Sequence, residues 1–208
     1  SRLRGLQTHK VRLDVASPGS RVAVNLVGIN TTQLQRGDVL TNSDWLKATT
    51  MLTVKLRLLP YLRHPLRHSV TVSFHTGSAE TMAKVRLLEG DELKPGRSTW
   101  VQLLLDRPVA ACGGDHFIIR SPVETLGGGK IVETRTRRLR RFRPEIIENL
   151  KAREAGSPEE IVLALLVTKR TLELSALLSQ INLPAGETRA VISSLVEQGK
   201  LVQLRQGE

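Results

Sequence analysis

A run of three glycines followed by a lysine, residues 127–130, is the part of this sequence closest to a phosphate-binding loop. In such a loop, backbone N–H groups and the lysine hold phosphates, and a hydroxyl residue after the lysine binds Mg²⁺. Here Glu124 stands where the first glycine is needed, and Ile131 stands where the hydroxyl is needed. The residues that follow favour a strand, so no helix N-terminus is available for phosphate. We therefore predict a glycine-kinked barrel corner rather than a nucleotide-hydrolysing loop.

Patterns for metal binding and catalysis are weaker still. His64 and His68 are four residues apart, but Pro65 lies between them, and Arg63 and Arg67 would repel a cation. No Ser/His/Asp order with a nucleophile elbow is present in the sequence. The sequence therefore predicts no catalytic residue, no metal site and no cofactor in this chain.

Basic residues carry the strongest functional signal. Lys and Arg number 31 against 20 Asp and Glu, a net charge of +11, divided as +4 in residues 1–41, +3 in 42–133 and +4 in 134–208. An excess spread in this way suits a long polyanion better than one local pocket. The densest part is a linker with six arginines, Arg135, Arg137, Arg138, Arg140, Arg141 and Arg143. These arginines suit phosphate contact or a solvated linker, and the sequence leaves both interpretations open.

Apolar residues alternate with polar ones from about residue 50 to 133, as in Leu52, Val54 and Leu56, and glycine-containing turns separate the runs. This period-two pattern predicts short strands that close as a barrel or sandwich. Residues 1–41 are also strand-like but too few to hold a core alone, so we expect them to belong to a barrel whose beginning is missing.

The longest apolar run, residues 161–167, is far shorter than the roughly 20 residues of a membrane span. A single cysteine, Cys112, fits a reducing compartment.

The periodicity becomes helical after the basic linker. Pro144 suits the first turn of a helix, and residues 157–160 form a capping box for a second helix. A later helix ends at Gly199, before the strand-like residues 201–204. This order predicts a winged helix over residues 144–208. The helix that would enter a DNA groove carries no net charge. A role as a spacer or in contacts with another protein therefore fits this module at least as well as the recognition of DNA bases.

Several motifs of this sequence occur together in one family. Residues 4–9, 18–26 and 36–40 resemble the second half of domain II of the translational GTPases that deliver aminoacyl-tRNA. Residues 75–80, 84–88, 113–122 and 125–129 resemble domain III of the same proteins. A winged helix after domain III is a mark of the bacterial selenocysteine-specific elongation factors (SelB) within this superfamily, and Arg141–Glu145 resembles its entrance.

The resemblance implies a mostly β fold with a helical C-terminal domain. It divides the chain into a partial domain II β-barrel (1–41), the domain III β-barrel (42–133), the basic linker (134–143) and the first winged helix (144–208). It also implies a factor that brings selenocysteyl-tRNA to the ribosome, binds GTP and Mg²⁺ through a GTPase domain absent here, and holds an mRNA hairpin through later winged helices. We accordingly expect a cytoplasmic monomer without membrane contact, and no enzymatic activity in this chain itself.

Three basic residues, Arg21, Arg36 and Arg67, match positions that contact tRNA in the family, and we expect a fourth, Lys130, to contact tRNA as well. The resemblance places Arg21 against the aminoacyl group, where a cation could hold the selenolate; the alternative is an arginine paired with a nearby carboxylate. It places Arg36 near the terminal adenosine, although Gln33 stands where relatives have an acidic residue. Arg67 and Lys130 would contact the tRNA backbone, and a plain exposed arginine is the alternative for Arg67.

Two other classes of protein fit parts of the pattern. A stand-alone regulator would fuse a β sensor domain to a DNA-binding winged helix, and it needs a complete barrel within residues 1–133 and a basic face on the last helix. A purely structural interaction module would leave the charge of +11 without a partner.

Overall fold

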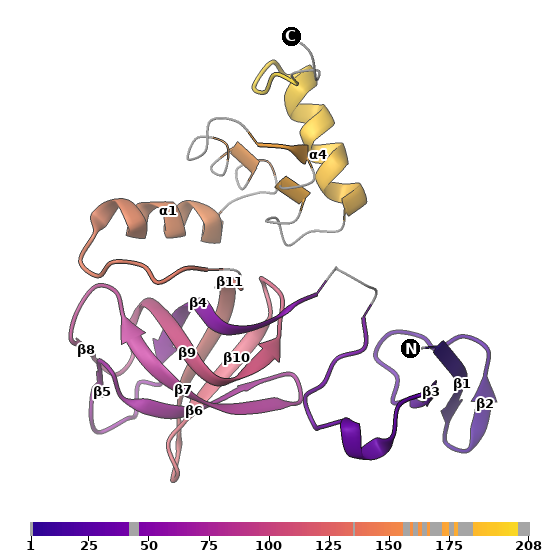
Figure 1. The fold of residues 1–208 in the computed structure, drawn as a ribbon. Helices are drawn as coiled ribbons and strands as arrows, with labels where there is room; N and C mark the ends of the chain where they lie inside the picture. Colours follow the sequence, from indigo (N-terminus) through magenta and orange to yellow (C-terminus); the bar gives the residue numbers. More distant parts are fainter. Residues whose placement is uncertain are drawn as a thin grey trace. The chain divides into compact units, whose positions relative to one another are not determined.

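The computed structural model describes residues 2–41, 46–134, 136–155 and 185–203, together with residues 159, 162, 163, 166, 172–174, 177 and 178. The chain separates into two compact units, Ser1–Asp38 and Val39–Glu208. Strands make up most of the regular structure in the described ranges (Figure 1). The two α-helices with assigned bounds lie in the C-terminal third, and a short 3-10 helix, η1 (Thr31–Gln33), lies in the first unit. The fold is therefore mostly β, as predicted.

The first unit is a small antiparallel sheet. Strands β1 (Arg2–Thr8), β2 (Val11–Leu13) and β3 (Ala23–Val27) pair in the order β2-β1-β3. His9 and Lys10 join the first two strands with φ of 45° and 67°, as a tight hairpin turn requires. No described residue of this unit is buried, so its sheet has no core of its own within that range.

The second unit contains a closed barrel (Figure 1). Its strands are β4 (Ala48–Leu58), β6 (Thr71–Thr76), β7 (Ala79–Leu87), β9 (Ser98–Ala110), β10 (His116–Arg120) and β11 (Thr125–Glu133). They close in the order β10-β11-β4-β9-β7-β6, and every pair is antiparallel. Two short strands, β5 (Leu66–Arg67) and β8 (Glu92–Leu93), pair separately. Closure leaves the barrel without a free sheet edge. Of the barrel and the sandwich that the alternating pattern left open, the structure has the barrel.

The alternating apolar residues fill the barrel interior, and part of the outer face of the barrel is buried as well. Leu52, Val54 and Leu56 point inward and are fully buried, as their period predicts. Trp100 and Gln102 occupy alternate positions on β9 and should face water, yet both are 0% exposed. Something outside the barrel therefore covers this part of β9.

The glycine run belongs to strand β11, between β4 and β10. A Cβ atom on Gly127 would lie 2.2 Å from the carbonyl oxygen of Arg57, and one on Gly129 would lie 1.9 Å from that of Lys55. Both separations are far below van der Waals contact, so only glycine lets the neighbouring backbones approach. The glycines are thus part of the barrel wall within one continuous strand, which confirms a structural role for this run but not the kinked corner expected there.

Gly129→Ala should destabilise the barrel by about 3 kcal/mol, because the backbone of β4 would have to move to admit the new methyl group. Thermal or urea unfolding of the chain measures this loss. Gly90→Ala is the matched control, since its nearest neighbour would be 3.6 Å away and its change in stability should stay below about 1 kcal/mol. Equal losses in the two variants would contradict the steric explanation.

The C-terminal part contains helices α1 (Pro144–Ala155) and α4 (Ala185–Glu197). Pro144 begins α1, as predicted, and Gly199 (φ 69°) follows α4 where the Lys200 N–H donates to the Leu195 carbonyl at 2.9 Å. The expected capping box at 157–160 lies outside the described residues except for Glu159. Residues 201–203 form no strand, so the wing strand expected there is not found. These residues have no described strand to pair with, and the winged helix stays a prediction.

Candidate nucleic-acid interface

One buried side chain, Gln102 on β9, holds the basic linker against the outside of the barrel. Its Nε2 donates to the Arg137 carbonyl at 2.9 Å, and its Oε1 accepts from the Leu139 N–H at 2.9 Å. Arg86 on β7 donates from Nη1 to the same Oε1 at 3.0 Å and to the Leu139 carbonyl. The amide thus pairs with the linker backbone as a neighbouring strand would. The linker is bound along this stretch rather than free in solvent.

Arg141 fastens the linker a second time. Its Nε donates to the Leu87 carbonyl at 2.8 Å, and its Nη2 donates to the Gly90 carbonyl at 2.7 Å and to Asp91 Oδ1 at 2.5 Å. The guanidinium also lies 4.5 Å from the ring centre of Phe142. The hydrogen bond from Arg141 lowers the pKa of the Asp91 carboxyl. This arginine is committed to the barrel and has little capacity left for phosphate.

Helix α1 completes the cover over β9. Ile147 and Leu150 are buried against Leu88 and Trp100 of the barrel. The Nζ atom of Lys55 lies 4.3 Å from the ring centre of Trp100. Two ion pairs bridge the helix to the barrel, Arg153 with Glu133 and Glu154 with Lys55. This apolar contact explains why Trp100 is buried on the outer face.

The structure separates the six predicted linker arginines into different classes. Arg137, Arg138, Arg140 and Arg143 are exposed and can meet a ligand. Arg141 is partly buried in the contacts just described, and Arg135 lies outside the described residues. The sequence offered a signal for this attachment, since Gln102 is the one polar residue in the apolar stretch of residues 100–105. The importance of Gln102 and Arg86 was nevertheless missed.

The two predicted residues of the first unit are exposed. Arg21 precedes β3, and its carbonyl accepts a hydrogen bond from Thr8 Oγ1 at 2.8 Å. Arg36 lies in a turn with Gly37 (φ 101°), closed where Asp38 Oδ2 accepts from the Gln35 N–H. Neither arginine forms an ion pair within the described ranges. The carboxylate-paired alternative for Arg21 therefore has no support there.

The two predicted residues of the barrel are also exposed. Arg67 lies on β5 opposite Glu92. Lys130 lies on β11 between Lys55 of β4 and His116 of β10. The Lys130 position thus adds to a basic row that crosses three strands, whereas Arg67 has an acidic residue across from it.

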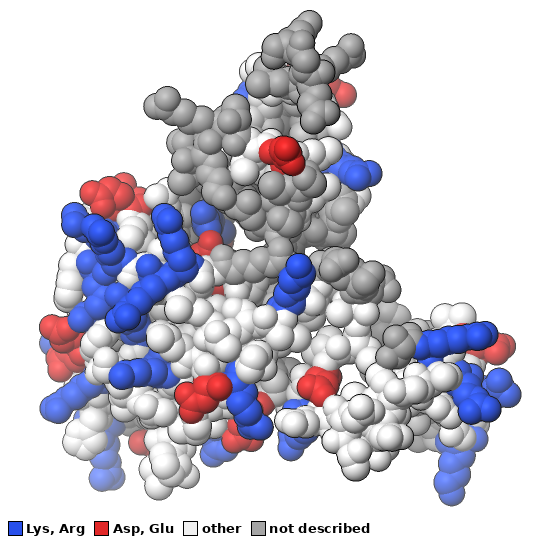
Figure 2. All heavy atoms as spheres, in the orientation of Figure 1, with Lys and Arg blue, Asp and Glu red and all other residues white. Residues whose placement is uncertain are grey.

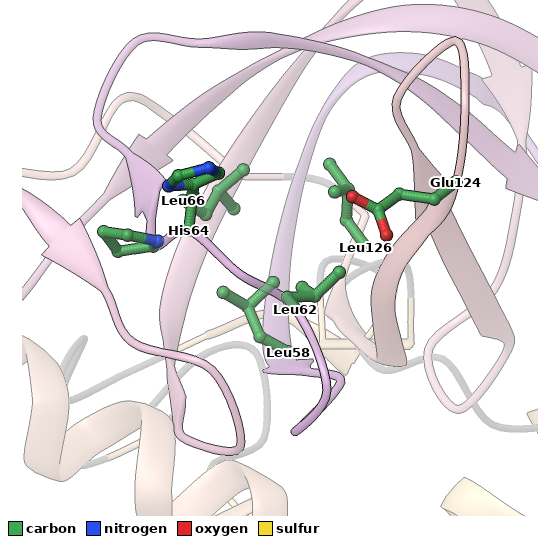
Figure 3. Close-up of a pocket in the computed structure, with 7 residues that line it drawn as sticks. Leu58, Leu62, His64, Leu66, Glu124 and Leu126 are labelled. Carbon is green, nitrogen blue, oxygen red and sulfur yellow. The ribbon is translucent and has the colours of Figure 1, made fainter.

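The two histidines of the 64–68 segment lie in different surroundings. His64 lines a cavity of about 110 Å³, and Figure 3 shows it across the cavity from Glu124 and Leu126. His68 lies after β5, and its Nδ1 is buried without a hydrogen-bond partner in the described structure. In the described ranges, no three His, Cys, Asp or Glu side chains group as metal ligands would, and no helix has the length and apolarity to cross a membrane.

The surroundings of His68 change its titration. Burial lowers its pKa below the ordinary value of 6.5, and the cations of Arg141, Arg86 and Lys84 lower it further, against an opposing effect of Asp91. The folded state therefore favours the neutral imidazole, while the unfolded chain takes up a proton near pH 6.5. This contribution to stability is present above pH 6.5 and is lost as the pH falls below it.

An NMR titration of the ring protons should give a His68 pKa below 6.5. Arg141→Gln should raise that pKa, because it removes a nearby cation and frees Asp91. Arg143→Gln, which alters an exposed arginine of the same linker, should leave it unchanged. A His68 pKa above 6.5 in the unaltered chain would contradict the combined effect of burial and the neighbouring cations on this ring.

Gln102→Leu should release the linker, since it removes two hydrogen bonds to the linker backbone and one to the Thr136 hydroxyl of the linker, as well as those with Arg86 and Thr53. We expect a loss of about 2–3 kcal/mol in unfolding free energy and faster tryptic cleavage at Arg137 and Arg138. Gln7→Leu, the same change at an exposed strand position, serves as the control. Unchanged cleavage in the Gln102 variant would show that the linker is held by other contacts.

Comparisons with known proteins agree with the fold and the motifs. Residues 50–138 match the family model described as "Selenocysteine-specific elongation factor, beta-barrel domain". The chain is 38% identical over 166 residues to a selenocysteine-specific elongation factor of Desulfomicrobium baculatum, covering 79% of this chain and 26% of that protein. It is 27% identical over 135 residues to one from Haemophilus influenzae, covering 64% of this chain and 21% of that protein. The chain thus spans about a quarter of the length of the curated relatives it matches.

Proposed function

This chain is of the SelB type and carries the β-barrel domain of selenocysteine-specific elongation factors, and on that premise we propose that it works in the delivery of selenocysteyl-tRNA to the ribosome. The observation that supports this proposal most strongly is that the 38% identity extends over 79% of the chain, well beyond the barrel alone. We assign GTP and Mg²⁺ binding, GTP hydrolysis and mRNA-hairpin binding to parts of a longer cytoplasmic factor outside these 208 residues.

Within this proposal, the chain supplies RNA contacts rather than chemistry. Arg67 and Lys130 are exposed on the barrel and would meet phosphates of the tRNA backbone. Arg21 and Arg36 are exposed in the first unit and would meet the aminoacylated end, where the Arg21 cation suits an ionised selenol. Phosphate contacts supply affinity and position, and contacts to the aminoacyl end supply selectivity.

Binding of selenocysteyl-tRNA to the 208-residue chain, followed by filter binding from 50 to 200 mM salt, tests this role. Affinity should fall steeply, with a log–log slope of a few units. The double change Arg67→Ala and Lys130→Ala should reduce the slope by about 1.4–1.8, because each lost phosphate contact is worth about 0.7–0.9.

The control is Arg189→Ala with Lys200→Ala, which removes the same charge from exposed positions at and after α4. Its slope should match that of the unaltered chain. Competition by duplex DNA tests the alternative function, that of a DNA-binding regulator. The charges of Arg189 and Glu197, both exposed on α4, cancel, so we expect duplex DNA to compete poorly with tRNA. A flat salt response, or displacement of tRNA by equimolar duplex DNA, would contradict the proposed role.

A further inference from the structure

Four cationic side chains and one histidine meet where the linker crosses β7 and the segment between β7 and β8. Lys84 and Arg86 come from β7, His68 follows β5, and Arg138 and Arg141 come from the linker. Arg138 and Arg141 act electrostatically on Arg86, and Lys84, Arg86 and Arg141 act on His68. Figure 2 shows Lys and Arg side chains gathered over this part of the second unit. We call these five residues the junction cluster.

The junction cluster has more positive charge than its neighbours neutralise. Asp91 is the only carboxylate that forms an ion pair with a member of the cluster in the described structure, and it pairs with Arg141. Arg86 bonds only to uncharged oxygens there, those of Gln102 and Leu139. Burial lowers the pKa of Arg86, and the cations of Arg138 and Arg141 lower it further. The free protein therefore carries like-charge repulsion that a bound anion would relieve.

The cluster is reachable from solvent at its rim. Lys84 and Arg138 are exposed, while Arg86 and His68 are partly buried beneath them. Two flexible cations beside the more fixed guanidinium of Arg86 can follow a chain of phosphates without reading bases, because base recognition needs specific donors aimed at base edges. The arrangement matches a nucleic-acid backbone better than a single small anion.

The cluster also depends on the attachment of the linker. Arg86 and Arg138 are 52 positions apart in sequence, and the bonds of Gln102 to Arg137 and Leu139 bring Arg138 to the barrel. Without these bonds, Lys84 and Arg86 would remain on β7, while the linker backbone on both sides of Arg138 would lose its bonds to Gln102.

We propose that the junction cluster is a binding surface for the phosphate backbone of RNA, and that it is complete only while Gln102 holds the linker. The inference goes beyond the proposed delivery of selenocysteyl-tRNA, since it requires neither an aminoacyl group nor a tRNA shape. It assigns phosphate contact to Lys84 and Arg138, and it assigns none to Arg143, which belongs to the same arginine run.

The probe is a fluorescein-labelled single-stranded RNA of 20 nucleotides and mixed sequence, titrated with the 208-residue chain. Lys84→Ala with Arg138→Ala should weaken binding about tenfold at 0.1 M salt and reduce the log–log salt slope by about 1.4. Both side chains are exposed, so the variant should unfold at the same temperature as the unaltered chain. The matched control, Arg143→Ala with Lys151→Ala, removes two exposed cations from the linker and α1 and should change affinity less than twofold.

Gln102→Leu tests the dependence on the linker. If it folds, it should lose the affinity contributed by Arg138 and tolerate Arg138→Ala without further loss. Equal losses in the Lys84/Arg138 and Arg143/Lys151 variants would overturn the proposal, because charge alone would then explain binding. Displacement of the RNA by poly-glutamate at the same charge concentration would also overturn it, in favour of an acidic protein partner. The two proposals can also fail separately. If the chain does not bind selenocysteyl-tRNA, while the Lys84/Arg138 variant still binds the 20-nucleotide probe more weakly than the Arg143/Lys151 variant, only the delivery function is contradicted.

Discussion

The outer surface of the second unit depends on the need of one buried amide, that of Gln102, for hydrogen-bond partners. A buried amide left unpaired costs about 1–3 kcal/mol, so the barrel is more stable when the linker backbone lies against β9. The attached linker in turn leads into α1, whose Ile147 and Leu150 cover Trp100. One polar residue on an outward strand position thus sets the course of the chain for about twenty residues after the barrel.

Attachment gives the arginines of one short run different physical roles. Arg141 donates to two barrel carbonyls and to Asp91, so its charge stabilises the fold. Arg138 is exposed and lies near Arg86, where its charge is available to a ligand. Neutral hydrogen-bond partners hold the backbone, while unpaired charges remain for an anion. A linker of this composition can therefore be both a structural element and a binding surface.

The glycine run shows how a local pattern can belong to two kinds of site. Gly127, Gly128 and Gly129 precede a lysine, as in phosphate-binding loops, but they stand in β11 where the neighbouring carbonyl oxygens leave no room for a Cβ. The positions of Glu124 and Ile131 already argued against nucleotide chemistry. The structure adds the positive reason for the glycines, which is close approach of three backbones in the barrel wall.

The sequence by itself determined the alternating strands, the turns and the start of α1, because alternation, glycine and proline act through local backbone preferences and through burial of one strand face. Its alternating pattern left a barrel and a sandwich open. The sequence also predicted the exposed cations and, through family motifs, the type of protein. It did not predict that Arg141 would be bound to the barrel or that Gln102 would be buried. It also did not predict that Lys84 and Arg86 would lie close to the basic residues of the linker. Those outcomes depend on contacts between residues 35 to 54 positions apart, which no local period encodes, so only the tertiary structure decided them.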